Sequence, residues 1–108
     1  MTVDWNLISS MPDCYHVIVS DNYHYQDPDE QYVITGFATE AEALTECRKI
    51  VERCLVDFAE PGKSADEVYS AYTMFGDDPS IVGAKGGVPV TFSGWDYARE
   101  HASRFVRP

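Results

Sequence analysis

The sequence predicts an α+β fold: a small antiparallel sheet covered on one face by three helices, in the order β-β-α-α-β-α. Two strand-like segments come first, two capped amphipathic helices follow, and a further strand-like segment precedes a third capped helix. With 108 residues, of which 44% are hydrophobic, the chain has the size and composition of one globular domain. We therefore expect a single domain over residues 1–108, with residues 1–12 as a flexible N-terminal arm.

The first two strands form a predicted hairpin. Residues 14–26 alternate with a period of two, and Val17 and Val19 lie on the apolar face of this segment. Residues 27–30 read Asp-Pro-Asp-Glu, a type I turn signal, and residues 32–37 are mostly β-branched or aromatic. Ile18 lies on the polar face, where we expect it to be exposed. That face is therefore a candidate contact for a homodimer.

Two helices follow, and each begins with a capping box. Thr39 with Glu42, and Ser64 with Glu67, have the spacing in which a hydroxyl and a carboxylate cap a helix N-terminus. The first helix is expected to run to about residue 58, with the apolar stripe Leu44, Cys47, Val51, Cys54, Leu55 and Phe58. The stripe of the second is Ala65, Val68, Tyr69, Tyr72 and Phe75. We expect Gly76 to end this helix in the left-handed conformation.

The signals are mixed between residues 77 and 92. Residues 80–82 are a short strand candidate, and residues 83–87, with three glycines, are expected to be mobile. Residues 88–92 look extended, but Pro89 limits them to an edge strand or to no strand. Residues 80–92 could therefore form one strand, two or none. Ser93 then caps a third helix, whose apolar stripe is Trp95, Ala98, Ala102 and Phe105.

The charge is strongly asymmetric. The formal net charge is −10, and residues 1–46 contain nine acidic residues without a single Lys or Arg. Nucleic-acid binding depends on basic side chains that neutralise phosphates, so direct DNA or RNA binding is not expected. An acidic surface serves solubility, and it also suits a basic protein partner.

The remaining composition points to the cytoplasm. No apolar run approaches the length of a membrane span, and the first residues lack the basic and apolar regions of a secretion signal. Cys14, Cys47 and Cys54 are an odd number of cysteines without metal-site spacing, so we expect buried thiols in a reducing compartment.

Several segments together resemble a known family. They are residues 21–25 (Asp-Asn-Tyr-His-Tyr), the helix capped by Thr39, residues 72–79 (Tyr-Thr-Met-Phe-Gly-Asp-Asp-Pro) and residues 92–98 (Phe-Ser-Gly-Trp-Asp-Tyr-Ala). In these segments the chain is similar to a family of small uncharacterised bacterial proteins. The resemblance implies a bacterial source and a single domain. It implies no activity and no catalytic residue.

The candidate functional surface combines the hairpin tip with a later acidic pair. It consists of Asp21, Tyr23, His24, Asp27, Asp77 and Asp78. Asp21 falls on the apolar face of its strand, which a bulge or local hydrogen bonds to the backbone would explain better than a functional cleft. Asp77 and Asp78 are interpreted as a polar loop after a helix C-terminus. Their charge there calls for compensation by Lys63, an arginine of the last helix or a ligand.

Two functions follow as hypotheses. The preferred one is a non-enzymatic protein-interaction or regulatory module, whose acidic hairpin or open sheet face binds a basic protein. The alternative is a small metal-dependent or acid–base hydrolase centred on Asp21 and His24. We assign no catalytic residue, metal ligand or cofactor from the sequence. A concave pocket lined by Asp21 would favour the enzyme, and a convex, filled hairpin tip would favour the module.

Overall fold

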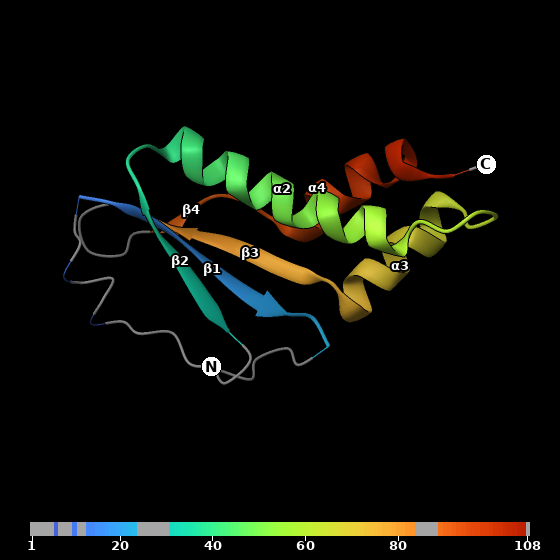
Figure 1. Ribbon diagram of the computed structural model, residues 1–108, viewed down its shortest axis with the longest axis horizontal. Coiled ribbons are helices and arrows are strands. Elements are labelled where there is room, and N and C mark those ends of the chain that lie inside the picture. The colour runs from blue at the N-terminus through green and yellow to red at the C-terminus, as the bar shows by residue number, and fades with distance from the viewer. Residues whose placement is uncertain (1–5, 7–9, 11–12, 24–30, 84–88, 108) are drawn as a thin grey trace.

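The computed structural model describes residues 6, 10, 13–23, 31–83 and 89–107. It confirms an α+β fold with the expected order of elements (Figure 1). The elements are β1 (Tyr15–Asp21), β2 (Tyr32–Phe37), α2 (Glu40–Phe58), α3 (Ala65–Phe75), β3 (Asp77–Val82), β4 (Pro89–Val90), α4 (Gly94–His101) and the 3₁₀ helix η2 (Ala102–Phe105). The predicted turn at residues 27–30, most of the glycine-rich segment and nearly all of the expected N-terminal arm lie outside the described residues.

The strands form an antiparallel sheet in the order β2-β1-β3-β4, with the helices gathered on one side of it (Figure 1). β1 is an inner strand: Ile18 pairs with Val33 of β2 on one side and with Ser80 of β3 on the other. Residues 80–92 therefore contribute to two strands. The second, β4, is a two-residue edge strand that contains Pro89, where a missing backbone N–H is tolerated.

The three predicted N-caps are confirmed. The hydroxyl oxygens of Thr39, Ser64 and Ser93 each accept a hydrogen bond from the backbone N–H three residues later. At Ser64 the capping box is complete, because its own N–H donates to the Glu67 carboxylate at 3.1 Å. No helix in the described part of the chain has both the length and the apolar character needed to cross a membrane.

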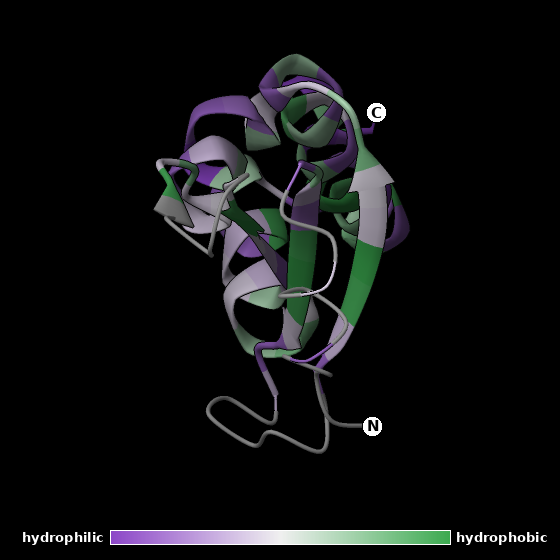
Figure 2. Cartoon of the chain, turned by 90° about the vertical axis from the view of Figure 1, so that its left-hand side faces the viewer, coloured by the Kyte–Doolittle hydropathy of each residue, from purple (hydrophilic) through white to green (hydrophobic). Residues whose placement is uncertain are grey.

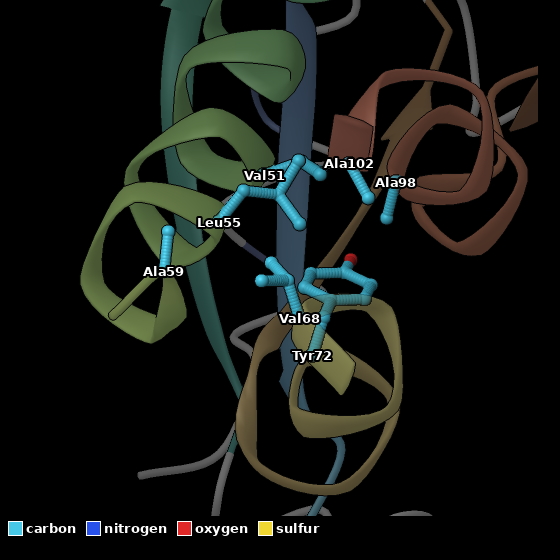
Figure 3. Packing of buried hydrophobic residues seen from close by; sticks show 7 residues of the cluster. All are labelled: Val51, Leu55, Ala59, Val68, Tyr72, Ala98 and Ala102. Atoms are coloured by element: carbon cyan, nitrogen blue, oxygen red, sulfur yellow. The ribbon is translucent and has the colours of Figure 1, made fainter. Parts of the chain in front are cut away.

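Two clusters of buried side chains hold the layers together. One lies among the helices and contains Val51, Leu55, Ala59, Val68, Tyr72, Ala98 and Ala102, which converge in Figure 3. The other joins the sheet to α2 and contains Val17, Val19, Ala43, Cys47, Ile50 and Ile81. The hydropathy colouring fits this division, because the strands carry strongly hydrophobic stretches while the helices alternate between hydrophobic and hydrophilic turns (Figure 2).

The left-handed conformation expected of Gly76 is wrong. Its φ and ψ are −81° and 175°, so the chain leaves α3 in an extended conformation and enters β3 at the next residue. A glycine is needed here because of space: a Cβ would lie 2.5 Å from the ring of Tyr72 and 2.8 Å from the carbonyl oxygen of Tyr72. Close packing against Tyr72 therefore explains this glycine.

The exposure expected of Ile18 is also wrong. Only 7% of this residue is accessible, and it packs with Val82 and Val33 in a small third cluster. Side chains alternate along a strand, so Ile18 projects away from the face that carries Val17 and Val19. The prediction of a homodimer contact on this face depended on an exposed Ile18, and the burial of Ile18 removes that support.

Candidate functional site

Pairing between β1 and β3 brings three of the predicted site residues to one end of the sheet. Asp21 lies opposite Asp77, and Ser20 lies opposite Asp78. The prediction that Asp77 and Asp78 form a loop is therefore wrong, because they are the first two residues of β3. Pairing with β1 decides their conformation, and a local reading of Asp-Asp-Pro could not reveal it. We call Asp21, Asp77 and Asp78 the acidic end of the sheet.

Local hydrogen bonding explains Asp21, as expected. Its Oδ1 accepts the backbone N–H of Tyr23 at 2.9 Å, which turns the chain immediately after β1. The irregularity in the register of β1 and β2 lies elsewhere, between Tyr15 and Val17. Of the explanations offered for Asp21, the backbone hydrogen bond is the one present.

Asp77 has an unfavourable environment for its charge. Burial and, secondarily, the nearby carboxylate of Asp21 raise the pKa of Asp77, and Arg53 of α2 opposes this increase. The compensating cation is thus Arg53, not Lys63 or an arginine of the last helix. No local pattern could identify this cation, because Arg53 lies in α2, more than twenty residues before Asp77 in the chain.

Asp78 is partly buried beside the first residue of α4. A Cβ on Gly94 would lie 2.8 Å from Oδ1 of Asp78 and 2.6 Å from the hydroxyl of Tyr72, so the backbone of α4 approaches both groups closely. Burial raises the pKa of Asp78, and no neighbouring charge is identified as a further cause. Asp78 therefore differs from Asp77 in having no compensating cation among the described residues.

Asn22, which is not among the residues predicted for the site, fixes the geometry of this end of the sheet. Its side-chain N–H₂ donates to the Tyr72 carbonyl at 2.9 Å, and its side-chain oxygen accepts the indole N–H of Trp95 at 3.1 Å. Its backbone N–H donates to the carbonyl of Gly76 at 2.9 Å. With only 8% of its surface accessible, Asn22 ties β1 to α3 and α4. Its position directly after Asp21, at the end of a strand, was the available signal.

The hydroxyl of Tyr72 completes this network. It donates a hydrogen bond to the carbonyl of Asp77 at 2.8 Å, and burial raises the pKa of Tyr72. The phenol is therefore a neutral donor that holds the start of β3 against α3. This buried tyrosine is a structural residue of the site.

Three aromatic side chains near these residues are unusually exposed. Tyr23 is 65% accessible and stacks on Phe75, which is 52% accessible, with ring centroids 5.5 Å apart. Trp95 is 40% accessible. Phe75 and Trp95 were expected in the apolar stripes of their helices, and for these two residues the expectation of burial is wrong. Each lies at the end of its helix, where the stripe passes beyond the core.

A cavity of about 620 Å³ opens beside the acidic end of the sheet. It is lined by residues that follow β1, by residues of α3 and β3, and by residues at and just before the start of α4, among them Asn22, Asp78, Ser80, Phe92, Ser93 and Trp95. Asp21 and Asp77 are not among the lining residues. The cavity thus has one acidic wall residue, Asp78.

The remaining predicted site residues, His24 and Asp27, lie outside the described residues. Within the part of the chain that the structure describes, no three His, Cys, Asp or Glu side chains are grouped so that they could hold a metal ion. The metal-binding alternative at Asp21 and His24 is therefore not tested, because its histidine is not described.

The cysteines form no disulfide and differ in their surroundings. Cys47 is buried against the sheet, whereas Cys14 and Cys54 are half-buried. Burial, with smaller contributions from Glu46 and Asp78, raises the pKa of Cys47 to about 12. The Cys54 sulfur accepts the backbone N–H of Asp77 at 3.5 Å, but burial still raises its pKa. Neither thiol has the lowered pKa of a reactive cysteine.

Comparisons with known proteins add no relative to this description. Scans of protein-family models, of curated proteins and of solved structures give no match to the chain.

Proposed function

We propose that this protein is a non-enzymatic interaction module, and that the acidic end of the sheet and the exposed aromatic pair beside it bind a basic segment of a protein partner. The observation that carries the proposal is the stacking of Tyr23 on Phe75 at the surface. Tyr23 lies two residues after Asp21, and Phe75 lies two residues before Asp77. The surface thus combines exposed aromatic area with carboxylates.

This combination is typical of interfaces. Exposed apolar groups rimmed by polar residues mark protein-binding surfaces, and tyrosine is enriched among the residues that dominate binding energies. Carboxylates around such a patch favour partners of opposite charge and increase the rate of encounter. Asp21 and Tyr23 also belong to the first 46 residues, whose nine acidic side chains without a Lys or Arg create a strong negative field.

The same proposal includes a bacterial source and a cytoplasmic location. Free thiols at all three cysteines are consistent with a reducing compartment. In the cytoplasm the protein would meet basic proteins of the kind proposed as its partner.

Affinity capture from a bacterial cytosolic extract at low and high salt tests the proposal. The test variant carries Tyr23→Ser and Phe75→Ser. The matched control is Val56→Ser, which removes an exposed apolar side chain from α2. We expect a basic protein that is captured by wild type and control, is lost with the test variant, and is released as salt rises. Capture that is equal for all three proteins at both salt concentrations would refute the proposal.

The alternative, a hydrolase centred on Asp21 and His24, has one observation in its favour. Asp21 lies opposite Asp77, whose pKa is raised by burial and, to a smaller degree, by Asp21, and a carboxyl group with a raised pKa is suited to act as a general acid. Against it, Asp21 is not among the residues that line the cavity. Binding of a divalent cation that is abolished by Asp21→Asn but not by Asp66→Asn would favour this alternative.

A further inference from the structure

The cavity beside Asp78 has an unusual composition for a surface hollow. Its volume of about 620 Å³ is within the range of small-ligand sites, and its walls combine one carboxylate with two aromatic rings, Phe92 and Trp95. Serine hydroxyls and the Asn22 amide supply further polar groups. Such a lining is suited to a ligand that is cationic at one point and apolar around it.

Among the described residues, no cation neutralises the carboxylate of Asp78. The ion pair formed among the described residues joins Lys63 to Glu60, and burial alone accounts for the raised pKa of Asp78. A partly desolvated carboxylate without a cationic neighbour is energetically costly, and a bound cation would offset that cost. The negative charge also disfavours an anionic ligand at the nearby N-terminus of α4.

The aromatic wall is held in place before any ligand arrives. The Trp95 indole N–H donates to Asn22, and the Asn22 side chain in turn donates to the Tyr72 carbonyl. Because Asn22 is buried, this chain of hydrogen bonds restricts the orientation of the indole. The ring nevertheless remains partly exposed, as a cation–π contact requires.

From these observations we infer that the cavity binds a single arginine side chain of the basic partner, with its guanidinium group between the carboxylate of Asp78 and the ring of Trp95. Arginine fits better than lysine because its planar guanidinium can pair with a carboxylate and stack on an aromatic face at the same time. The inference rests on the proposed function and specifies the side chain that the partner inserts.

The test uses the full-length protein and three short peptides. They are acetylated, amidated tripeptides with Gly on each side of arginine, lysine or citrulline, the last being a neutral isostere of arginine. Binding is followed by NMR at the indole N–H of Trp95, which Trp95→Phe distinguishes from that of Trp5. We expect the arginine peptide to shift this resonance, the lysine peptide to bind more weakly, and the citrulline peptide to bind about tenfold more weakly or not at all.

The variant pair Asp78→Asn and Asp66→Asn locates the site. Asp78→Asn should weaken arginine binding about tenfold, whereas Asp66→Asn, at an exposed acid of α3 outside the cavity lining, should leave it unchanged. Unchanged spectra elsewhere show that each variant is folded. Equal binding of arginine and citrulline, full affinity in Asp78→Asn, or no shift at Trp95 would each overturn the inference. Equal binding of lysine would overturn the preference for arginine.

Failure of this inference and failure of the proposed function can be distinguished. If the captured partner depends on Tyr23 and Phe75 but the arginine peptide does not bind, only the inference is wrong. If the peptide binds but no partner depends on Tyr23 and Phe75, the cavity is a cation site and the interaction surface is wrong.

Discussion

Asp21 and Asp77 lie directly opposite each other across the pairing of β1 with β3, so two carboxylates face one another between residues that are distant in sequence. Like charges in such positions destabilise a sheet. Here the cost appears as a raised pKa of Asp77, for which burial is the larger cause and Asp21 the smaller. Arg53 offsets part of it.

Replacing Asp21 by Asn should stabilise the protein at neutral pH. Asn can still accept the Tyr23 N–H through its side-chain oxygen, and the repulsion on Asp77 is removed. Because the pKa of Asp77 is raised in the folded state, wild type loses stability as pH rises and Asp77 ionises. The gain in stability of Asp21→Asn over wild type should therefore be present at pH 7 and vanish below about pH 4, where Asp77 is protonated. Urea unfolding of both proteins across this pH range measures it. A loss of stability at pH 7 would contradict the prediction.

Asp78→Asn should follow the same pH dependence for a different reason. Burial raises the pKa of Asp78, so the wild-type folded state is penalised when the carboxyl is ionised and relieved when it is protonated. The variant should therefore be more stable than wild type at pH 7 and equally stable in acid below about pH 4. Thermal unfolding at both pH values tests this, with Glu46→Gln, at a partly exposed acid in the middle of α2, as the control. An advantage that persists in acid would exclude charge burial as its cause.

Leu55→Ala should destabilise the domain strongly. Leu55 is fully buried in the cluster among the helices, and truncation of a buried leucine costs about 2–5 kcal/mol. The adjacent Val56 is exposed on the same helix, so Val56→Ala should cost less than about 0.5 kcal/mol. Denaturant midpoints of the three proteins give the comparison, and equal midpoints would show that the helix stripe is not part of the core.

Gly76→Ala and Gly76→Asn should both be destabilising. An added Cβ would contact the ring and carbonyl of Tyr72, and overpacking of this kind costs about 1–3 kcal/mol. Asn is informative because it tolerates the left-handed conformation, which Gly76 does not adopt. If Asn were accepted while Ala was not, a left-handed backbone and not close packing would explain the glycine.

Cys47 should resist thiol reagents in the folded protein. The thiolate is the reactive form, and a pKa of about 12 leaves little of it at pH 8 in a side chain that is also buried. Mass spectrometry after iodoacetamide treatment should find Cys14 modified early and Cys47 modified only as fast as the protein unfolds. Modification of Cys47 at a rate independent of added urea would contradict the burial.

The features that sequence could predict are those set by neighbours in the chain. Thr39, Ser64 and Ser93 cap their helices because the groups that bond lie within three residues of each other. The β-branched composition of residues 32–37 identified β2 for the same reason. Asp21 could be explained because its hydrogen-bond partner, the N–H of Tyr23, is two residues away.

The features that sequence missed depend on distant partners. Pro79 and two acids conceal the start of β3, which becomes a strand only because β1 pairs with it. The cation beside Asp77 comes from α2, and the exposure of Phe75 depends on where α3 leaves the core. Asn22 has partners in α3 and α4 that no local pattern could identify. The cavity is assembled from the same distant segments.

The position of β1 inside the sheet also has a consequence for synthesis on the ribosome. His16 pairs with Val82, so one side of β1 remains without its strand until both long helices and β3 have been made. Until then Val17 and Val19 can be covered from the helix side, but the backbone of β1 on the β3 side has no strand to bond with. Because β3 is synthesised long after β1, the nascent chain carries an open strand edge during much of its synthesis. Contacts between segments so distant in sequence also form slowly once both are present. The sheet is therefore completed late, and a stalled or shortened chain that ends before β3 would present that edge to other chains.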